Sequence, residues 1–439
     1  MNYFIGLDFG TSGARVALID AQKTLLFQTG QRFEAGEHDR PVAWQELLFS
    51  LLAEIPEEYR QTATAIEIDG TSSTVLLCDV VGQPIAAPLL YHDGRGVDQL
   101  STLQLLLAKY PDTPTKDIVL SSTSSLAKLL WLCQHTDAAK AHYLLHQADW
   151  LGFLLHGQLG ISDYHNSLKL GYDVQHLTYP DWFQPIHELL QQRGANHLKL
   201  PQVKIPGQAI ASVLPMVAIS LDLPKQCKVC AGTTDSNAAF FASGASQPGE
   251  AVTSLGSTLV LKLLSETPVN SRAHGIYSHR WGDLWLVGGA SNTGGAVLQH
   301  FFSPEELTTL SQKIPVGEPS PLDYYPLLQP GERFPMNDPQ LAPRLEPRPE
   351  DPVAFLHGLL ESIGRIEREG YRLLEQLGAS PLKRVYTAGG GAANLQWQQI
   401  RDRLLGVPVQ PATQTEAAYG AACLALNGWL QSCTQDPCS

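Results

Sequence analysis

Residues 5–20 read IGLDFGTSGARVALID, and this stretch contains the pattern that decides the fold. Apolar residues lead up to Asp8, a Gly-Thr-Ser-Gly turn follows at residues 10–13, and a second apolar run begins at Val16. Two apolar runs joined by a short turn predict a pair of antiparallel strands. One carboxylate, Asp8, therefore stands at the end of a strand beside a glycine turn, and its position raises the question of what it binds.

The same pattern returns about half a chain later. Residues 250–264 read EAVTSLGSTLVLKLL, which again predicts a strand, a Gly-Ser-Thr turn and a strand, and a further hairpin is predicted over 275–292. In the first half, residues 24–30 supply the third strand. Each half is thus expected to begin with a three-stranded antiparallel meander and to continue into helices. Two copies of one α/β domain explain this pattern, and two unrelated hairpins in one α/β protein remain the alternative.

Other segments fill in the α/β pattern. Residues 65–79 predict a strand, a polar turn and a second strand, and residues 124–134, 148–157 and 354–378 predict helices. The Pro-rich stretch 315–352 predicts an extended surface excursion. Residues 41–55 predict a helix, whose expected buried face consists of Val42, Leu47, Leu48, Leu51, Leu52 and Ile55.

Composition excludes several classes of protein. The chain has 439 residues, 44% of them hydrophobic, and a net charge of -13 without a run of Lys or Arg, so neither nucleic acid nor an anionic membrane is an expected partner. Its apolar runs are too short to span a bilayer and its N-terminus has no basic flank, so a cytoplasmic protein is expected. Its seven cysteines form no regular framework, and Cys227 and Cys230 lack the second ligand pair of a zinc site.

The two turns are candidate phosphate sites. Backbone N–H groups of a glycine-rich turn bind anions, so turns at Gly10 and Gly256 can grip a polyphosphate from two sides. Thr11 and Ser12 can donate hydroxyl groups to the same phosphates, and Asp8 can hold Mg²⁺ directly or through water. The alternative for each turn taken alone is an ordinary surface turn, because Gly, Ser, Thr and Asp are common in turns.

Three further sites are chemically suggestive. Gly389, Gly390 and Gly391 lie between a predicted strand and helix, where a flat ring can approach the backbone, and a third phosphate site or a capping turn are the alternatives. Asp235 precedes a predicted helix and is either its N-cap or a general base for an attacking alcohol. Ser72, Asp93 and Arg95 can bind the hydroxyl groups of a polyol, and a solvated loop is the alternative.

Taken in order, these motifs resemble the FGGY carbohydrate kinases of the actin-like ATPase superfamily, and the resemblance runs from Gly6 to about Gly428. The matching segments are GLDFGTSGAR, LAKLLWL with Lys128 and Trp131, GTTDSNAAF, SLGST and AGGGAANLQWQQI. After the strand at 65–69 the chain reads Asp-Gly-Thr-Ser, which lacks the signatures of the family's xylulose and glycerol kinases. This form resembles the compact cyanobacterial and plant D-ribulose kinases.

The resemblance implies two ribonuclease-H-like domains, each a mixed sheet flanked by helices, with ATP and Mg²⁺ in the cleft between them. The expected domains are residues 1–245 and 246–439, with the last helix packing back on the first domain. Asp235 matches the catalytic base, Asp8 the Mg²⁺-associated aspartate and Thr11 a phosphate-side catalytic threonine. The implied ATP-binding residues are Gly10, Thr11, Ser12, Gly13, Arg15, Gly256, Ser257, Thr258, Gly389, Gly390, Gly391 and Asn394. The implied sugar-binding residues are Asp8, Ser72, Asp93, Arg95 and Asp235.

The implied function is phosphoryl transfer from MgATP to the terminal hydroxyl of a ketopentose. D-ribulose is the expected acceptor, and D-xylulose or another polyol is the first alternative. An actin-like ATPase switch acting on a protein partner is the second alternative, which the absence of a long peptide-binding domain disfavours. A monomer or a weak homodimer is expected.

Overall fold

The computed structural model describes residues 2–110 and 116–435. The chain forms two compact units, one of Met1–Ala242 with Glu416–Ser439 and the other of Ser243–Thr415. They are called the N-terminal and C-terminal units below. Among the described helices, none is both long and apolar enough to cross a membrane.

The N-terminal unit is built on a mixed sheet with the strand order β3-β2-β1-β4-β10-β9, and β11 also pairs with β4. The strands β1, β2 and β3 form the predicted antiparallel meander, while β4 runs parallel to β1. The strands of this sheet are β1 (Tyr3–Phe9), β2 (Gly13–Asp20), β3 (Leu25–Arg32), β4 (Ala63–Gly70), β9 (Ala209–Ser212), β10 (Lys228–Cys230) and β11 (Thr233–Thr234).

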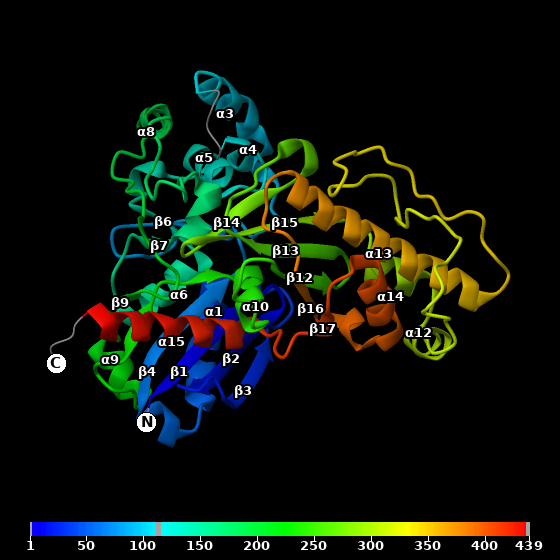
Figure 1. Cartoon of the computed structure of the whole chain (residues 1–439). Coiled ribbons are helices and arrows are strands. Elements are labelled where there is room, and N and C mark those ends of the chain that lie inside the picture. Colours follow the sequence, from blue (N-terminus) through cyan, green and yellow to red (C-terminus); the bar gives the residue numbers. More distant parts are fainter. Residues whose placement is uncertain (1, 111–115, 436–439) are drawn as a thin grey trace. The chain divides into compact units, whose positions relative to one another are not determined.

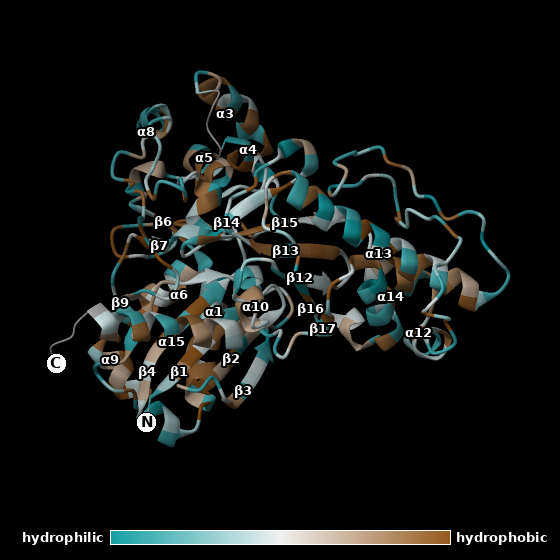
Figure 2. Ribbon diagram, viewed as in Figure 1, coloured by the Kyte–Doolittle hydropathy of each residue, from teal (hydrophilic) through white to brown (hydrophobic). Residues whose placement is uncertain are grey.

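Hydrophobic layers cover both faces of this sheet. On one face Ile5, Leu7 and Ile66 pack with side chains of α1 (Pro41–Glu54) and α6 (Gln147–His156). On the other face Phe4 and Ala65 pack against α15 (Ala417–Gln435), which is the last helix of the sequence. The helix can approach because Gly6 has no Cβ atom, and a Cβ there would collide with the carbonyl oxygen of Ala418. Strand β1 is accordingly buried along most of its length, and Figure 2 shows the hydropathy of its residues.

Two small sheets and further helices complete the N-terminal unit. The second strand of the predicted pair at 65–79 does form, as β5, but it pairs with β6 rather than with the main sheet. The small strands are β5 (Val75–Cys78), β6 (Tyr143–His146), β7 (Ile161–Asp163) and β8 (Gln202–Lys204). The remaining helices are α2 (Glu57–Arg60), α3 (Leu100–Leu107), α4 (Lys116–Val119), α5 (Ser125–His135), α7 (Tyr164–Ser167), α8 (Phe183–Gln192), α9 (Pro215–Ser220) and α10 (Asp235–Ala242).

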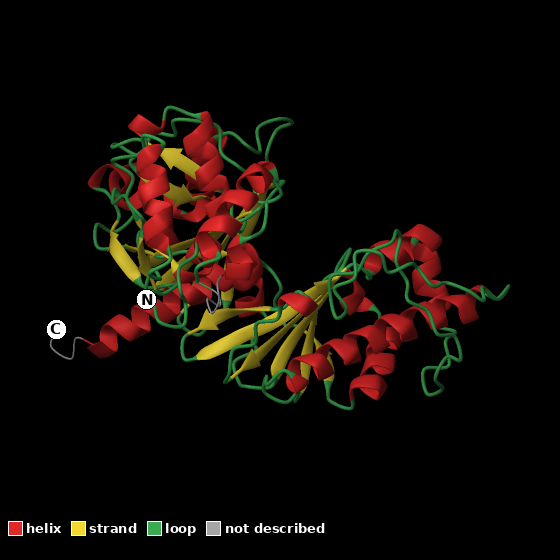
Figure 3. Ribbon diagram, turned by 90° about the horizontal axis from the view of Figure 1, so that it is seen from above, coloured by secondary structure: helices red, strands yellow, loops and turns green. Residues whose placement is uncertain are grey.

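The C-terminal unit contains a six-stranded sheet with the order β14-β15-β13-β12-β16-β17. Figure 3 shows its strands in yellow and helices in red. The expected three-stranded meander is wrong here, because β15 and not the next strand in sequence pairs with β13, which leaves β14 at the edge. The strands are β12 (Glu250–Leu255), β13 (Leu259–Ser265), β14 (Tyr277–Trp281), β15 (Leu284–Ser291), β16 (Arg384–Ala388) and β17 (Val409–Pro411). The helices are α11 (Gly295–Phe301), α12 (Pro304–Ser311), α13 (Pro352–Gln376) and α14 (Leu395–Leu405).

The expected buried face of α1 needs one correction. Val42 is 58% exposed, and Trp44 is fully buried in its place. The reason is a tertiary contact, since Trp44 packs edge-on against Trp150 of α6 and donates its indole N–H to the carbonyl of His38. The face of the helix is thus set by the residue that has a partner on α6.

The Pro-rich excursion is extended. Residues 312–351, all of which the structure describes, contain neither helix nor strand and only isolated bridges such as Tyr325 with Arg344. Figure 1 shows this segment in yellow and pale orange near α13. Helix α13 begins directly after it, with Asp351 as the N-cap and Pro352 in the first turn.

Candidate active site

The first site residue is Asp8, near the end of β1. It is 6% exposed, and its register partner on β2 is Arg15, whose Nη1 lies 3.6 Å from Asp8 Oδ2. Burial raises the pKa of Asp8, while a hydrogen bond with Asp69 and the charge of Arg15 oppose that rise. Arg15 also pairs with Glu416 at 3.4 Å. Asp8 and Arg15 thus form an ion pair at the edge of the turn at residues 10–13.

Asp69 is a carboxyl group that the sequence motifs did not assign. It is the register partner of Asp8 on the parallel strand β4, and it is fully buried. Its pKa is raised well above the ordinary value, first by burial and then by the charges of Asp8, Glu67 and Asp235. A protonated Asp69 can donate to Asp8, whereas in the ionised form neither Asp69 oxygen has a partner among the described residues. Burial beside Asp8 therefore favours the protonated form of Asp69.

Asp235 lies in the first turn of α10. Its charge contributes to the raised pKa of Asp69. Strand β11 positions it, because Thr233 and Thr234 pair in parallel with Asp69 and Gly70 of β4. Asp235 Oδ1 accepts a hydrogen bond of 2.6 Å from the backbone N–H of Ser236. The structure thus brings Asp8 and Asp235 together around Asp69 at the carboxyl ends of adjacent parallel strands, where α/β sheets commonly bind ligands.

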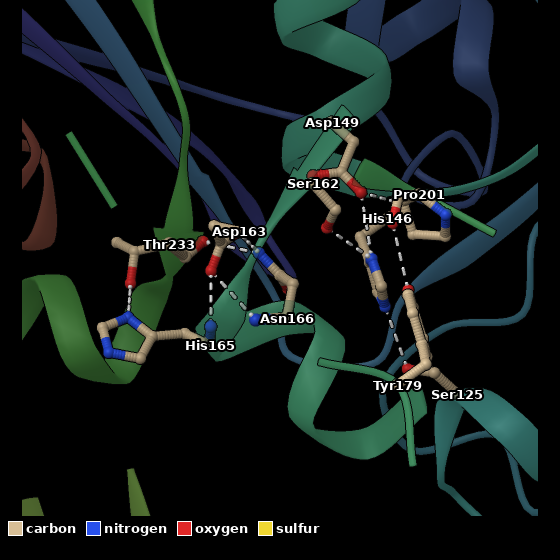
Figure 4. Close-up of polar contacts among 10 residues, drawn as sticks. All are labelled: Ser125, His146, Asp149, Ser162, Asp163, His165, Asn166, Tyr179, Pro201 and Thr233. Carbon is tan, nitrogen blue, oxygen red and sulfur yellow. Dashed lines mark hydrogen bonds and ion pairs between the residues drawn. The ribbon is translucent and has the colours of Figure 1, made fainter. Parts of the chain in front are cut away.

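A buried polar network holds β11 in place (Figure 4). Nδ1 of His165 lies 2.6 Å from Thr233 Oγ1, and Asn166 Nδ2 donates to the Thr233 carbonyl at 3.2 Å. Asp163 in turn fixes this segment by accepting hydrogen bonds from the backbone N–H groups of His165 and Asn166. Burial raises the pKa of Asp163 to about 7. Helix α7 and its N-cap Asp163 therefore anchor β11, the strand directly before Asp235.

The two predicted phosphate turns share one property. A Cβ on Gly10 would come no closer than 3.7 Å to another atom, and on Gly256 no closer than 3.8 Å, and neither glycine has a positive φ. Protein packing therefore does not require glycine at either position, which is the expectation for backbone that a ligand approaches. Gly13 differs, because its Cβ would collide with the carbonyl of Gln31 on β3. Thr11 and Ser12, between Gly10 and Gly13, are exposed.

The candidate sugar residue Ser72 lies in the loop that connects β4 to β5. Its neighbour Ser73 has a φ of 61°, and the Ser73 carbonyl accepts a hydrogen bond of 2.8 Å from Lys128 Nζ. The same ammonium group donates to Leu90 O at 2.6 Å, so it ties this loop to the segment before Asp93. Lys128 is fully buried, and burial lowers its pKa to about 7. Lys128 therefore ties the loop that contains Ser72 to the segment that leads to Asp93.

Asp93 and Arg95 form a close pair. Arg95 Nε lies 2.9 Å from Asp93 Oδ2, and the Arg95 guanidinium stacks over the Trp131 ring at 4.7 Å. The bond to Arg95 lowers the pKa of Asp93, although burial partly opposes this. Trp131 and Lys128 come from the same helix, α5, so this helix positions the whole polar group.

A cavity of about 520 Å³ lies in the C-terminal unit, between the phosphate turn and the glycine turn of the sequence. Gly256 and Ser257 line one side, and Gly390, Gly391 and Asn394 line the other, so segments far apart in sequence meet here. Helices α11 and α12 supply further walls, including Leu298, Gln299, Leu307, Thr308 and Ser311. Thr258 and Gly389 were also predicted at this site but do not line the cavity.

Protein packing also explains why glycine occupies two of the positions in the turn at residues 389–391. Gly389 has a φ of 82°, and a Cβ on Gly391 would lie 2.7 Å from Leu255 and 2.8 Å from Trp397. Asn394 caps α14 by accepting from the Trp397 N–H, and its Nδ2 donates to Ser311 Oγ at 2.9 Å. The capping alternative is therefore real, and it coexists with a place in the cavity wall. Gly390 is different, since a Cβ there would meet no protein atom within 4 Å.

The described residues contain no group of three or more His, Cys, Asp or Glu side chains that could hold a metal ion. A Mg²⁺ ion that binds phosphates usually retains waters and takes only one or two carboxylates. The orphaned oxygens of an ionised Asp69 beside Asp8 are compatible with this mode of binding. These carboxylates therefore fit a Mg²⁺ ion that phosphates and waters also coordinate, and not an ion coordinated by protein side chains alone.

Comparison with known proteins assigns the family. Residues 3–242 match the model of the FGGY family of carbohydrate kinases, N-terminal domain, and residues 251–429 match that of its C-terminal domain. A xylulose kinase of Bacillus subtilis is 26% identical over 98% of this chain and 90% of its own length. A glycerol kinase of Listeria monocytogenes is 24% identical over 96% of this chain and 89% of its own. Neither relative is a ribulose kinase, so the expected subgroup has no support from them.

The fold comparison agrees. The crystal structure of a xylulose kinase from Brucella ovis superposes with a TM-score of 0.82 at 22% identity, covering 98% of this chain and 91% of that one. The two-domain α/β fold with mixed sheets flanked by helices is therefore confirmed.

Proposed function

The chain belongs to the FGGY family of carbohydrate kinases, and from this premise we propose that it transfers the γ-phosphate of MgATP to the terminal hydroxyl of a ketopentose, with D-ribulose as the first candidate. The observation that carries the proposal is the grouping of Asp235, Asp8 and Asp69 at one edge of the N-terminal sheet. This edge presents a candidate base beside a candidate magnesium ligand.

In the proposed reaction Asp235 accepts the proton of the sugar hydroxyl as its oxygen attacks the γ-phosphorus. The bond from this phosphorus to the bridging oxygen of ADP breaks, and the products are ADP and the sugar phosphate. Asp8 would hold Mg²⁺, which supplies charge neutralisation to the phosphates when it is bound. Backbone N–H groups of the turns at Gly10 and Gly256 would hold the phosphate oxygens.

The nucleotide is proposed to bind in the cavity between Gly256 and Gly390. Its volume of about 520 Å³ lies in the range typical of small-molecule sites. Gly390, which no protein contact requires, leaves room for a flat ring to approach the backbone. The hydroxyl and amide groups of Ser257, Thr308 and Gln299 in the wall can bind polar atoms of the base or ribose.

The choice of sugar rests on residues 69–72, which read Asp-Gly-Thr-Ser. In this loop Gln147 Oε1 accepts a hydrogen bond of 3.1 Å from the backbone N–H of Thr71. Ser72 follows directly and is the proposed sugar-binding residue. D-xylulose is the second candidate, favoured by the names of the relatives. Epimers differ in one hydroxyl, whose recognition depends on leaving no buried polar group unpaired.

The test is ADP release from MgATP with D-ribulose, L-ribulose, D-xylulose, L-xylulose, ribitol, glycerol or no sugar. Stimulation by D-ribulose alone is expected. Stimulation by D-xylulose instead would support the kinase activity but show that D-xylulose, and not D-ribulose, is the acceptor. Steady hydrolysis that no sugar stimulates would refute the proposal and favour an ATPase switch.

A further inference from the structure

The C-terminal unit contains a second cavity, of about 490 Å³, that shares no residue with the proposed nucleotide cavity. One wall is α13 between Ser362 and Gln376, and the other is the excursion between Asp323 and Arg344. Figure 1 shows both segments, with α13 in orange. The proposed kinase reaction uses no part of this cavity.

Arginine dominates the polar lining. Four arginines contribute to it, and they come from both walls: Arg344, Arg365, Arg368 and Arg372. The acidic members of the lining are Asp323 and Glu369. Four guanidinium groups and two carboxylates leave an excess of two positive charges, counting His274 of the lining as neutral. In a chain with a net charge of -13, such a concentration of positive charge is unusual.

Each of the two carboxylates forms ion pairs with two arginines. Asp323 lies 2.8 Å from Arg344 and 3.3 Å from Arg365, and Glu369 lies 3.0 Å from Arg368 and 3.5 Å from Arg372. The carboxylates thus bring the four cations together but neutralise only half of their charge. Guanidinium groups held in this way bind phosphate oxygens well, because each offers several N–H donors in a fixed plane.

Arg365 has an additional unsatisfied donor. Its Nη2 donates to the Leu322 carbonyl at 2.6 Å, while its Nε is buried without a hydrogen-bond partner. Its Nη1 lies 3.3 Å from Asp323, so the exposed part of this guanidinium is held at the cavity wall by two neighbouring groups. The rest of the lining is mostly apolar or aromatic: Tyr324, Tyr325, Pro335, Met336, Ile366 and Leu373.

We propose that this cavity is a second ligand site, which binds a phosphate monoester. The excess charge matches a phosphate dianion, and the apolar wall provides a surface for the carbon skeleton that bears it. A sugar phosphate and a nucleoside monophosphate share this chemistry. The site does not depend on the identity of the sugar that the enzyme phosphorylates.

The test is calorimetric titration of the full chain with inorganic phosphate, D-ribulose 5-phosphate or AMP, each at millimolar concentration. Arg344 and Arg372 are 57% and 59% exposed, so the double variant Arg344→Gln/Arg372→Gln should fold normally. It is expected to bind the tightest of the three probes about tenfold more weakly than the wild type. Arg365→Gln, which removes a third guanidinium group from the lining, is also expected to weaken binding.

The matched control is Arg384→Gln. Arg384 belongs to the same unit and also pairs with a carboxylate, Glu250 at 3.7 Å, but it lies outside the cavity lining. Its binding isotherms should equal those of the wild type. Comparison of the three affinities identifies the organic part of the ligand. If D-ribulose 5-phosphate binds more tightly than inorganic phosphate, the ligand is a sugar phosphate, and if AMP does, it is a nucleoside monophosphate.

Two results would overturn the proposal. One is the absence of binding by the wild type to all three probes. The other is binding that the arginine substitutions leave unchanged, since the anion would then lie elsewhere, for example at the phosphate turns. Thermal unfolding and ADP release, measured on the same samples, separate a misfolded variant or a failed kinase assignment from a failed second site.

Discussion

Asp8 and Asp69 occupy register-paired positions on the neighbouring parallel strands β1 and β4, where a protonated Asp69 can donate a hydrogen bond to the Asp8 carboxylate. Both side chains are buried, so two ionised carboxylates at these paired positions would repel each other strongly. A proton on Asp69, whose pKa burial raises, relieves this repulsion, and a bound cation can relieve it in the same way. The pair thus supplies a physical reason for a charge at the end of a core strand.

Replacing the candidate base tests the proposed chemistry. In Asp235→Asn the amide oxygen can still accept from the Ser236 N–H, so the start of α10 should be preserved. The loss of the proton acceptor is expected to lower kcat with the best sugar about a hundredfold or more. Asp137→Asn, which changes an exposed aspartate paired with Lys140, is the control and should retain wild-type kcat. Near-normal turnover by Asp235→Asn would exclude this residue as the base.

Replacing Lys128 tests whether it organises the sugar side. Lys128→Met leaves the carbonyls of Ser73 and Leu90 without their donor, which costs about 1–3 kcal/mol for each buried group. We expect kcat/KM for the sugar to fall about tenfold or more, while KM for ATP changes little. Lys140→Met removes an exposed lysine and serves as the control. Equal losses for sugar and ATP would indicate a general folding defect and not a local one.

The glycine turn allows a test of the nucleotide cavity. Gly390→Ala adds a methyl group that meets no protein atom, so the melting temperature should stay unchanged. Because Gly390 lines the cavity, we expect KM for ATP to rise about tenfold. Gly317→Ala, at another glycine with open space around its Cβ, is the matched control. If KM for ATP is the same in both variants, the nucleotide does not contact Gly390.

The pH dependence of stability tests Glu67. This side chain is fully buried, neither oxygen has a partner among the described residues, and burial raises its pKa well above the ordinary value. Its contribution to stability is complete below the unfolded-state pKa of about 4.3 and is lost as the pH rises toward the folded-state pKa. Glu67→Gln should therefore match the wild type near pH 4 and become increasingly more stable above it.

Chemical denaturation at a series of pH values measures this difference, which amounts to about 1.4 kcal/mol for each pH unit over which only the unfolded state is ionised. The exposed Glu58→Gln is the control and should follow the wild type throughout. A constant difference between Glu67→Gln and the wild type at all pH values would contradict the raised pKa.

Much of the fold was accessible from local patterns. The hairpins at 3–20 and 250–265 and the helix at 352–376 follow from alternation and helical periodicity, which depend only on nearby residues. The position of β15 between β13 and β14 did not follow, because strand order within a sheet is a choice among long-range pairings of similar local sequence. The exposure of Val42 has the same origin, since a tryptophan contact on another helix decided which face of α1 is buried.

The sequence by itself determined the chemical character of this protein: a carboxylate after an apolar strand, two glycine turns, and an aspartate ahead of a helix, in the order of a kinase family. Only the tertiary structure decided that Asp69 lies beside Asp8, that Lys128 joins two loops, and that Gly256 and Gly390 line one cavity. The physical reason is that residue types and turns are encoded locally, whereas register, burial and hydrogen-bond partners depend on the packing of distant segments.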